Sequence, residues 1–249
     1  MVPCATEALH ACDGVTIALD CYRQPRRDAE SGVIICPGFF QSKDTPTFRC
    51  LAATLAVEHD VVAMDFRGHG ASGGRYTFSA RESADLDAVL DWVAARYARI
   101  GILGFSLGGA IAINGVSHRP SDVQSLTLVS APDAFDAIEM RWWTPEAMRT
   151  GWQGWEPGAG CRVGNLWLPK EQPRERIQHL AAIPKLFIHG TRDAIVGMAH
   201  SQRLHAAAQE PKRLEIIEGG SHAEALFRDD PPGFSILVNG WFSQTLCAS

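Results

Sequence analysis

The sequence lacks several features that would decide its class at once. It has no uninterrupted apolar run of about 18 residues, the length that a membrane span needs, so we expect no membrane partner. Positive charge is also in short supply, because 23 Lys and Arg residues face 28 Asp and Glu residues and leave a net charge of −5. Without a basic field to concentrate polyanions, the chain is not expected to bind nucleic acid or an anionic lipid surface.

Cysteine pairs and ligand-binding motifs are missing as well. The seven cysteines are odd in number and scattered, with no C-x-x-C pair and no cluster with histidines. We therefore expect neither a disulfide framework nor a metal site, and a reducing compartment fits best. No phosphate-cradling loop and no dinucleotide fingerprint is present, so we expect no cofactor. The first residues show neither the basic start nor the apolar stretch of a signal peptide, and we expect a cytoplasmic protein.

The sequence is dominated instead by an alternation of short apolar runs with amphipathic segments. Its 249 residues suffice for one domain with a core of its own. Strands covered on both faces are predicted at 33–36, 61–64, 100–103, 126–129, 185–188 and 214–217, and helices at 45–58, 79–97, 107–116 and 236–246. This order predicts an α/β fold, a mostly parallel central sheet with helices on both faces.

Two segments depart from this alternation. Residues 8–21 alternate between apolar and polar and are split by Asp13-Gly14, which predicts a hairpin at an antiparallel edge. Residues 134–173 carry five of the seven tryptophans and several glycines, and we interpret them as a lid inserted within the single domain 1–249. Trp142, Trp143 and Trp152 are candidate substrate-binding residues, although such rings could equally pack the lid onto the body.

The pattern G-x-S-x-G, which is typical of a nucleophile elbow, occurs twice, at 104–108 and at 70–74. An elbow needs a buried strand directly before its first glycine and a helix directly after its serine. Only Ser106 has both, since an apolar run precedes it and an apolar helical segment follows it. We therefore predict Ser106 as the nucleophile and Ser72 as a loop serine.

A serine hydroxyl needs a base to take its proton. Of the nine histidines, His222 lies in a glycine-rich loop after the last predicted strand, at the sheet edge where Ser106 is expected. We expect His189 to pack at the end of its strand and His69 to brace a turn.

Two aspartates could orient this base, because Asp193 and Asp133 each follow a predicted strand. Placement alone permits either one. We favour Asp193, since it gives the chain order serine, acid, histidine that belongs to one particular fold. Asp133 could instead cap a helix that begins the insertion.

The oxyanion of an acyl-transfer intermediate needs hydrogen-bond donors. The backbone N–H of Leu107, directly after the nucleophile, is one candidate. The N–H of Phe39, in the loop after the strand at 33–36, is the other, and Gly38 permits the unusual turn there. Phe40, the next residue of that loop, is a candidate substrate-binding residue.

Together these residues resemble the α/β-hydrolase superfamily over nearly the whole chain. The matching landmarks are Pro37-Gly38-Phe39, Asp65-Phe66-Arg67-Gly68-His69-Gly70-Ala71-Ser72, Gly104-Phe105-Ser106-Leu107-Gly108-Gly109, His189-Gly190-Thr191-Arg192-Asp193 and Gly220-Ser221-His222. The predicted helix at 79–97 and the Gly-Arg-Tyr turn before it resemble those of small serine esterases and serine-aminopeptidase-like members, feruloyl esterases among them. One departure is visible, because many relatives begin the oxyanion loop with His-Gly, and here a side chain that usually braces the loop is absent.

The resemblance implies a serine hydrolase that cleaves small carboxylic esters through an acyl-enzyme. Two alternatives stay open at this stage. The same triad could act on an amide or peptide, a thioester or a carbon–carbon bond, and some proteins of this fold are non-catalytic ligand receptors. The sequence carries no indication of the oligomeric state.

Overall fold

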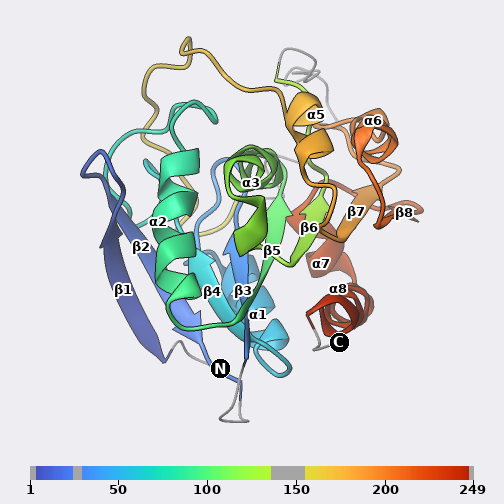
Figure 1. Ribbon diagram of the computed structural model, residues 1–249, viewed down its shortest axis with the longest axis horizontal. Helices are drawn as coiled ribbons and strands as arrows, with labels where there is room; N and C mark the ends of the chain where they lie inside the picture. Colours follow the sequence, from blue (N-terminus) through green and yellow to red (C-terminus); the bar gives the residue numbers. More distant parts are fainter. Residues whose placement is uncertain (1–3, 25–29, 136–154, 247–249) are drawn as a thin grey trace.

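An eight-stranded sheet between two layers of helices forms the body of the molecule (Figure 1). The computed structural model describes residues 4–24, 30–135 and 155–246. Strand order is β1-β2-β4-β3-β5-β6-β7-β8, and every pair from β4 to β8 is parallel. The strands are β1 Ala5–His10, β2 Thr16–Tyr22, β3 Ser31–Cys36, β4 Asp60–Met64, β5 Arg99–Phe105, β6 Ser125–Val129, β7 Lys185–Gly190 and β8 Lys212–Ile217. The predicted mostly parallel fold is confirmed.

The central strands are apolar throughout because both faces of the sheet are covered. In β3, Val33 and Ile35 pack into one of two hydrophobic clusters, on one face of the sheet, while Ile34 and Cys36 pack into the other, on the opposite face. Side chains alternate between faces along a strand, so a strand buried on both faces reads as a continuous apolar run. The helices are α1 Pro46–Leu55, α2 Ser83–Ala94, α3 Leu107–His118, α5 Pro173–Arg176, α6 Ala199–Ala207, α7 Glu224–Asp229 and α8 Pro231–Thr245, with 3-10 turns at Pro120–Asp122 and Ile177–His179.

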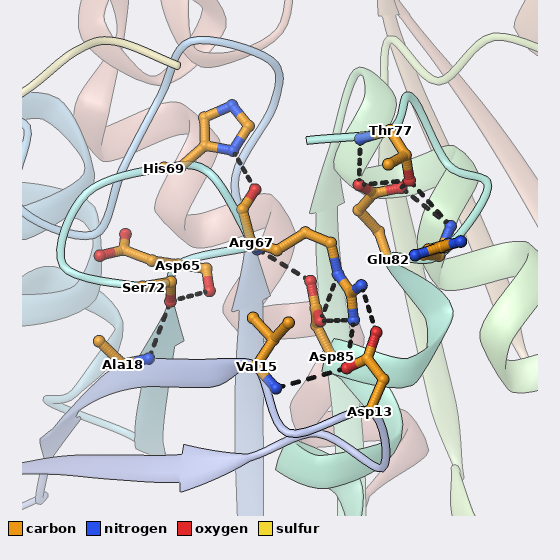
Figure 2. A network of polar contacts seen from close by, with 11 residues as sticks. Asp13, Val15, Ala18, Asp65, Arg67, His69, Ser72, Thr77, Glu82 and Asp85 are labelled. Atoms are coloured by element: carbon orange, nitrogen blue, oxygen red, sulfur yellow. Dashed lines mark hydrogen bonds and ion pairs between the residues drawn. The ribbon is translucent and has the colours of Figure 1, made fainter. Parts of the chain in front are cut away.

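The predicted hairpin is confirmed at one edge of the sheet. Strand β1 pairs antiparallel with β2, which pairs antiparallel with β4. Arg67, in the loop after β4, joins this edge to the helical layer (Figure 2). Its guanidinium lies 2.7 Å from Asp85 of α2 and 2.7 Å from Asp13 in the hairpin turn. Two carboxylates on a buried guanidinium satisfy its donors and fix its position.

The predicted insertion at 134–173 is described in part. Residues 136–154, with Trp142, Trp143 and Trp152, lie outside the described residues. The returning arm, which we define as residues 155–164, bonds to the body at several points, including Gly158 O, which accepts from the Ser42 hydroxyl at 3.0 Å. Trp155 and Trp167 are 69% and 94% exposed, so these two rings do not pack the insertion onto the body. No helix in the described part of the chain is both long and apolar enough to span a membrane.

Candidate active site

Ser106 lies at a sharp turn between β5 and α3, as the sequence predicts. Its backbone has φ 48° and ψ −122°, a strained conformation for a residue with a β-carbon, which costs about 1–3 kcal/mol. Gly108 permits the turn, because a β-carbon there would lie 2.3 Å from the carbonyl oxygens of both Cys36 and Pro37. The second glycine of the motif is therefore required by the close approach of α3 to the loop after β3.

Ser106, His222 and Asp193 form a hydrogen-bonded chain at the carboxyl edge of the sheet. The Nε2 atom of His222 lies 3.0 Å from the Ser106 hydroxyl, and its Nδ1 lies 2.7 Å from Asp193 Oδ2. A carboxylate can only accept, so Nδ1 carries the proton and Nε2 presents its lone pair to the serine. This arrangement makes the serine hydroxyl a candidate nucleophile with a base already in contact.

Asp133, the alternative candidate for orienting the histidine, has other partners. Asp133 is buried, and its carboxylate lies 2.5 Å from His200 Nδ1 and 2.8 Å from the Arg203 guanidinium, both on α6. His200 and Arg203 of α6 thus occupy the Asp133 carboxylate. The helix start that Asp133 could cap lies outside the described residues. The structure pairs Asp193, not Asp133, with His222.

The surroundings of Asp193 favour its ionised form. Its Oδ1 accepts the backbone N–H groups of Ile195 and Val196 at 3.0 and 2.8 Å. His189 Nε2 lies 3.2 Å from Oδ2, so this histidine does more than pack. Burial alone would raise the pKa of Asp193, but His222 and His189 lower that pKa well below its usual range.

His222 is held by its neighbours as well as by Asp193. The N–H of Ala223 donates to the Ser130 hydroxyl, at the end of β6, at 3.1 Å. Burial by itself would lower the pKa of His222, but the Asp193 carboxylate outweighs it and raises this pKa above its ordinary value. Nearby, Glu224 accepts from the Gln41 side chain at 2.7 Å, and its pKa is raised, mainly by burial.

Both oxyanion candidates border the nucleophile. Leu107 is the first residue of α3, so its N–H has no partner within the helix and lies at the positive end of the helix dipole. The loop of Phe39 passes directly over the serine, since a β-carbon on Gly38 would lie 3.2 Å from Ser106 Cβ. An oxyanion site requires backbone donors beside the nucleophile, and the roles of the Leu107 and Phe39 N–H groups stay predictions.

Aromatic rings form a wall beside this loop. Phe39 stacks on Tyr76 at 5.3 Å and meets Phe40 edge-on at 4.5 Å between centroids. Phe78 continues the wall to Phe135, at the start of the insertion. Phe40 is 45% exposed, and its role in substrate binding stays a prediction.

The rival motif is structural. Ser72 is buried, accepts the Ala18 N–H at 2.8 Å and donates to the Asp65 carbonyl at 2.7 Å (Figure 2). It joins the loop after β4 to the hairpin. Among the described residues, no group of three or more His, Cys, Asp or Glu side chains could hold a metal ion.

Sequence reasoning missed several partners of the site. The pair of Gln41 and Glu224 joins residues 183 positions apart, and no spacing or motif connects them. The contact of His189 with Asp193 could have been found, because the two residues are four positions apart at the end of one strand.

Comparison with known proteins adds the family context. A family model for the alpha/beta hydrolase fold matches residues 33–155, the part with the elbow. The uncharacterized protein Rv2307c of Mycobacterium tuberculosis is 32% identical over 183 residues, which are 70% of this chain and 58% of that protein. YfhR of Escherichia coli K12, also uncharacterized, is 26% identical over 171 residues, 67% of this chain and 54% of that protein. The chain thus spans little more than half the length of these relatives.

Two solved esterases have the same architecture. The esterase Pf2001 of Pyrococcus furiosus superposes with a TM-score of 0.78 at 22% identity, covering 98% of this chain and 93% of that one. The esterase RhEst1 of a Rhodococcus species gives a TM-score of 0.79 at 20% identity, covering 96% and 99%. At such identities the likeness is one of fold.

Proposed function

The chain has the alpha/beta hydrolase fold, and on that premise we propose that it is a serine hydrolase that cleaves small carboxylic esters. One observation carries the proposal: the unbroken hydrogen-bonded chain from Ser106 through His222 to Asp193. Geometry of this kind serves nucleophilic attack on a carbonyl, because each member prepares the next for its role. The solved esterases of the same fold favour esters as the bond that is cleaved.

In the first half of the proposed reaction, the Ser106 hydroxyl attacks the ester carbonyl carbon while His222 Nε2 takes its proton. The Asp193 carboxylate stabilises the imidazolium that forms. The N–H groups of Leu107 and Phe39 donate to the oxyanion of the tetrahedral intermediate. When this intermediate collapses, His222 gives its proton to the leaving alcohol, and an acyl-enzyme remains.

In the second half, water replaces the alcohol. His222 takes a proton from the water, whose oxygen attacks the acyl carbon, and a second tetrahedral intermediate uses the same oxyanion donors. Its collapse returns the proton to Ser106 and releases the carboxylic acid. The aromatic wall of Phe39, Phe40 and Phe78 supplies an apolar surface for the acyl or alcohol group.

Hydrolysis of p-nitrophenyl esters tests this proposal. Acetate through octanoate and one aromatic acyl ester should be turned over, and the chain-length profile measures the size of the site. Labelling by a fluorophosphonate, located by peptide mass spectrometry, is measured in parallel. If Ser106 is labelled but no ester is turned over, the bond that the protein cleaves would instead be an amide, a thioester or a carbon–carbon bond. Absence of both turnover and labelling would leave a non-catalytic receptor.

The pH dependence of kcat/KM is expected to show an acid limb that belongs to His222. Only the neutral imidazole can take the serine proton, so activity falls by about tenfold for each pH unit below the pKa of His222. Because Asp193 raises this pKa, the midpoint should lie above about 6.5, the value of an unperturbed histidine. The measurement is the initial rate on one soluble ester between about pH 5 and pH 9. A rate that does not change over this range would contradict the role of His222.

A further inference from the structure

The backbone of Phe40 is held from two sides by segments that are distant in sequence. Its N–H donates to His69 Nε2 at 3.3 Å, and its carbonyl accepts the N–H of Gly160, in the returning arm, at 2.8 Å. Phe40 has φ 68°, in the left-handed region that is strained for a residue with a β-carbon. The two bonds therefore hold a strained residue next to Phe39, whose N–H is the proposed oxyanion donor.

The tautomer of His69 is fixed by its second contact. The Nδ1 atom lies 3.2 Å from the Arg67 carbonyl, which can only accept, so Nδ1 carries the proton (Figure 2). Nε2 is then unprotonated and presents the lone pair that the Phe40 N–H needs. Burial lowers the pKa of His69 to about 4, which keeps the ring neutral at physiological pH.

His69 is itself held in place by Arg67 and Tyr76. The Arg67 carbonyl accepts the hydrogen bond from His69 Nδ1–H, and the Arg67 side chain is fixed by Asp85 and Asp13 (Figure 2). The His69 ring also meets the Tyr76 ring edge-on at 4.7 Å between centroids. These contacts fix His69, and with it the Phe40 N–H that it accepts, relative to the sheet and to α2.

The loop after β4 also forms a hydrogen bond, at a second point, with the loop after β3 that carries Phe39, which we call the oxyanion loop. Asp65 Oδ1 accepts the Lys43 N–H at 2.7 Å, three residues after Phe40. Pro37 and Gly38, which begin the oxyanion loop, have no polar side chain to brace it from within. Within the loop, the Gln41 N–H donates to the Gly38 carbonyl at 3.2 Å, and the contacts with His69 and Asp65 add support from the loop after β4.

We propose that His69 is a positioning residue that accepts the Phe40 N–H and so keeps the Phe39 N–H directed at the oxyanion. The inference rests on the proposed function, because the oxyanion exists only if Ser106 attacks a carbonyl. His69 does not touch the reacting atoms in this scheme. It acts through the loop, and its contribution appears when charge develops on the substrate oxygen.

The test compares His69→Phe, His69→Gln and the control His10→Phe, at an exposed histidine of β1. Phenylalanine keeps an aromatic ring against Tyr76 but has no acceptor, so we expect kcat to fall by about 10- to 100-fold with KM almost unchanged. Inhibition by a boronic acid, whose tetrahedral adduct occupies the oxyanion site, should weaken by a similar factor. Glutamine offers an oxygen acceptor and should restore most of kcat. A His69→Phe variant with wild-type kcat, or one that changes KM alone, overturns the proposal.

A second measurement needs no turnover and separates this inference from the proposed function. Nitrogen-15 NMR of the wild-type protein should show His69 as the neutral Nδ1–H tautomer from about pH 5 to about pH 8. The amide hydrogen of Phe40 should exchange slowly in wild type and His10→Phe, and quickly in His69→Phe. An Nε2–H tautomer, or an unprotected Phe40 amide in wild type, would overturn the bracing role even if esters are hydrolysed. If the NMR result is as expected but no ester is cleaved, His69 holds the Phe40 N–H as proposed and the proposed ester hydrolysis is wrong.

Discussion

Replacement of Ser106 by alanine is expected to lower kcat for ester hydrolysis by about 10⁵-fold while the protein stays folded. The alanine side chain has no hydroxyl to form the acyl-enzyme, and His222 then has no serine proton to take. Alanine fits the strained turn as well as serine does, since both carry a β-carbon, so the free energy of unfolding should change little. The measurement is turnover of p-nitrophenyl acetate by purified protein, with thermal unfolding as the test of folding.

The second G-x-S-x-G motif supplies a matched control. Ser72→Ala removes one buried hydroxyl that bonds to Ala18 and to Asp65. Such a loss costs about 1–3 kcal/mol of stability, because the Ala18 N–H is left without its acceptor. The folded Ser72→Ala protein should keep kcat within a few-fold of wild type. Equal activity of Ser106→Ala and wild type would show that Ser106 is not the nucleophile.

Asp193→Asn should lower kcat by about 10⁴-fold through the tautomer of His222. The N–H groups of Ile195 and Val196 need an acceptor, so the amide oxygen of asparagine should stay with them. Its NH₂ group would then face His222 Nδ1, which must become the acceptor. The proton moves to Nε2, and the base can no longer take the proton of Ser106. Turnover and thermal unfolding are measured as for Ser106→Ala.

Asp133→Asn is the control that separates the two aspartates. This change removes the negative charge that pairs with Arg203 and alters the hydrogen bond with His200, so thermal stability should fall. The folded enzyme should nevertheless keep most of its kcat, because His222 and its carboxylate are untouched. A result in the opposite sense, with Asp133→Asn folded and inactive and Asp193→Asn active, would assign the orienting role to Asp133.

Much of the fold follows from contiguous patterns in the sequence. Apolar runs such as 33–36 and 100–103 predict strands covered on both faces, and their spacing from amphipathic segments predicts the parallel sheet. Helix α6 was not found in this way, because only His200, Ser201 and Leu204 of its residues are buried. Two of these are polar, and their burial depends on partners in β7 and in the segment after β6 that no local pattern reveals.

In the candidate site, too, some features follow from the local sequence and others depend on the tertiary structure. The position of Ser106 is set by the residues next to it, a strand before and a helix after. These are interactions between neighbours in the chain, so the sequence by itself determines them. The sequence also predicts that Asp193, Asp133 and His222 each follow a strand, and therefore lie at one edge of the sheet.

Only the tertiary structure decided which of these groups meet. His222 pairs with Asp193 because the loops after β7 and β8 lie side by side, while α6 brings His200 and Arg203 to Asp133. The contact of His69 with Phe40 joins two loops 29 residues apart and depends on the parallel pairing of β3 with β4. A hydrogen bond depends on distance and angle to within a few tenths of an ångström, and in residues far apart along the chain that geometry exists only once the sheet has assembled.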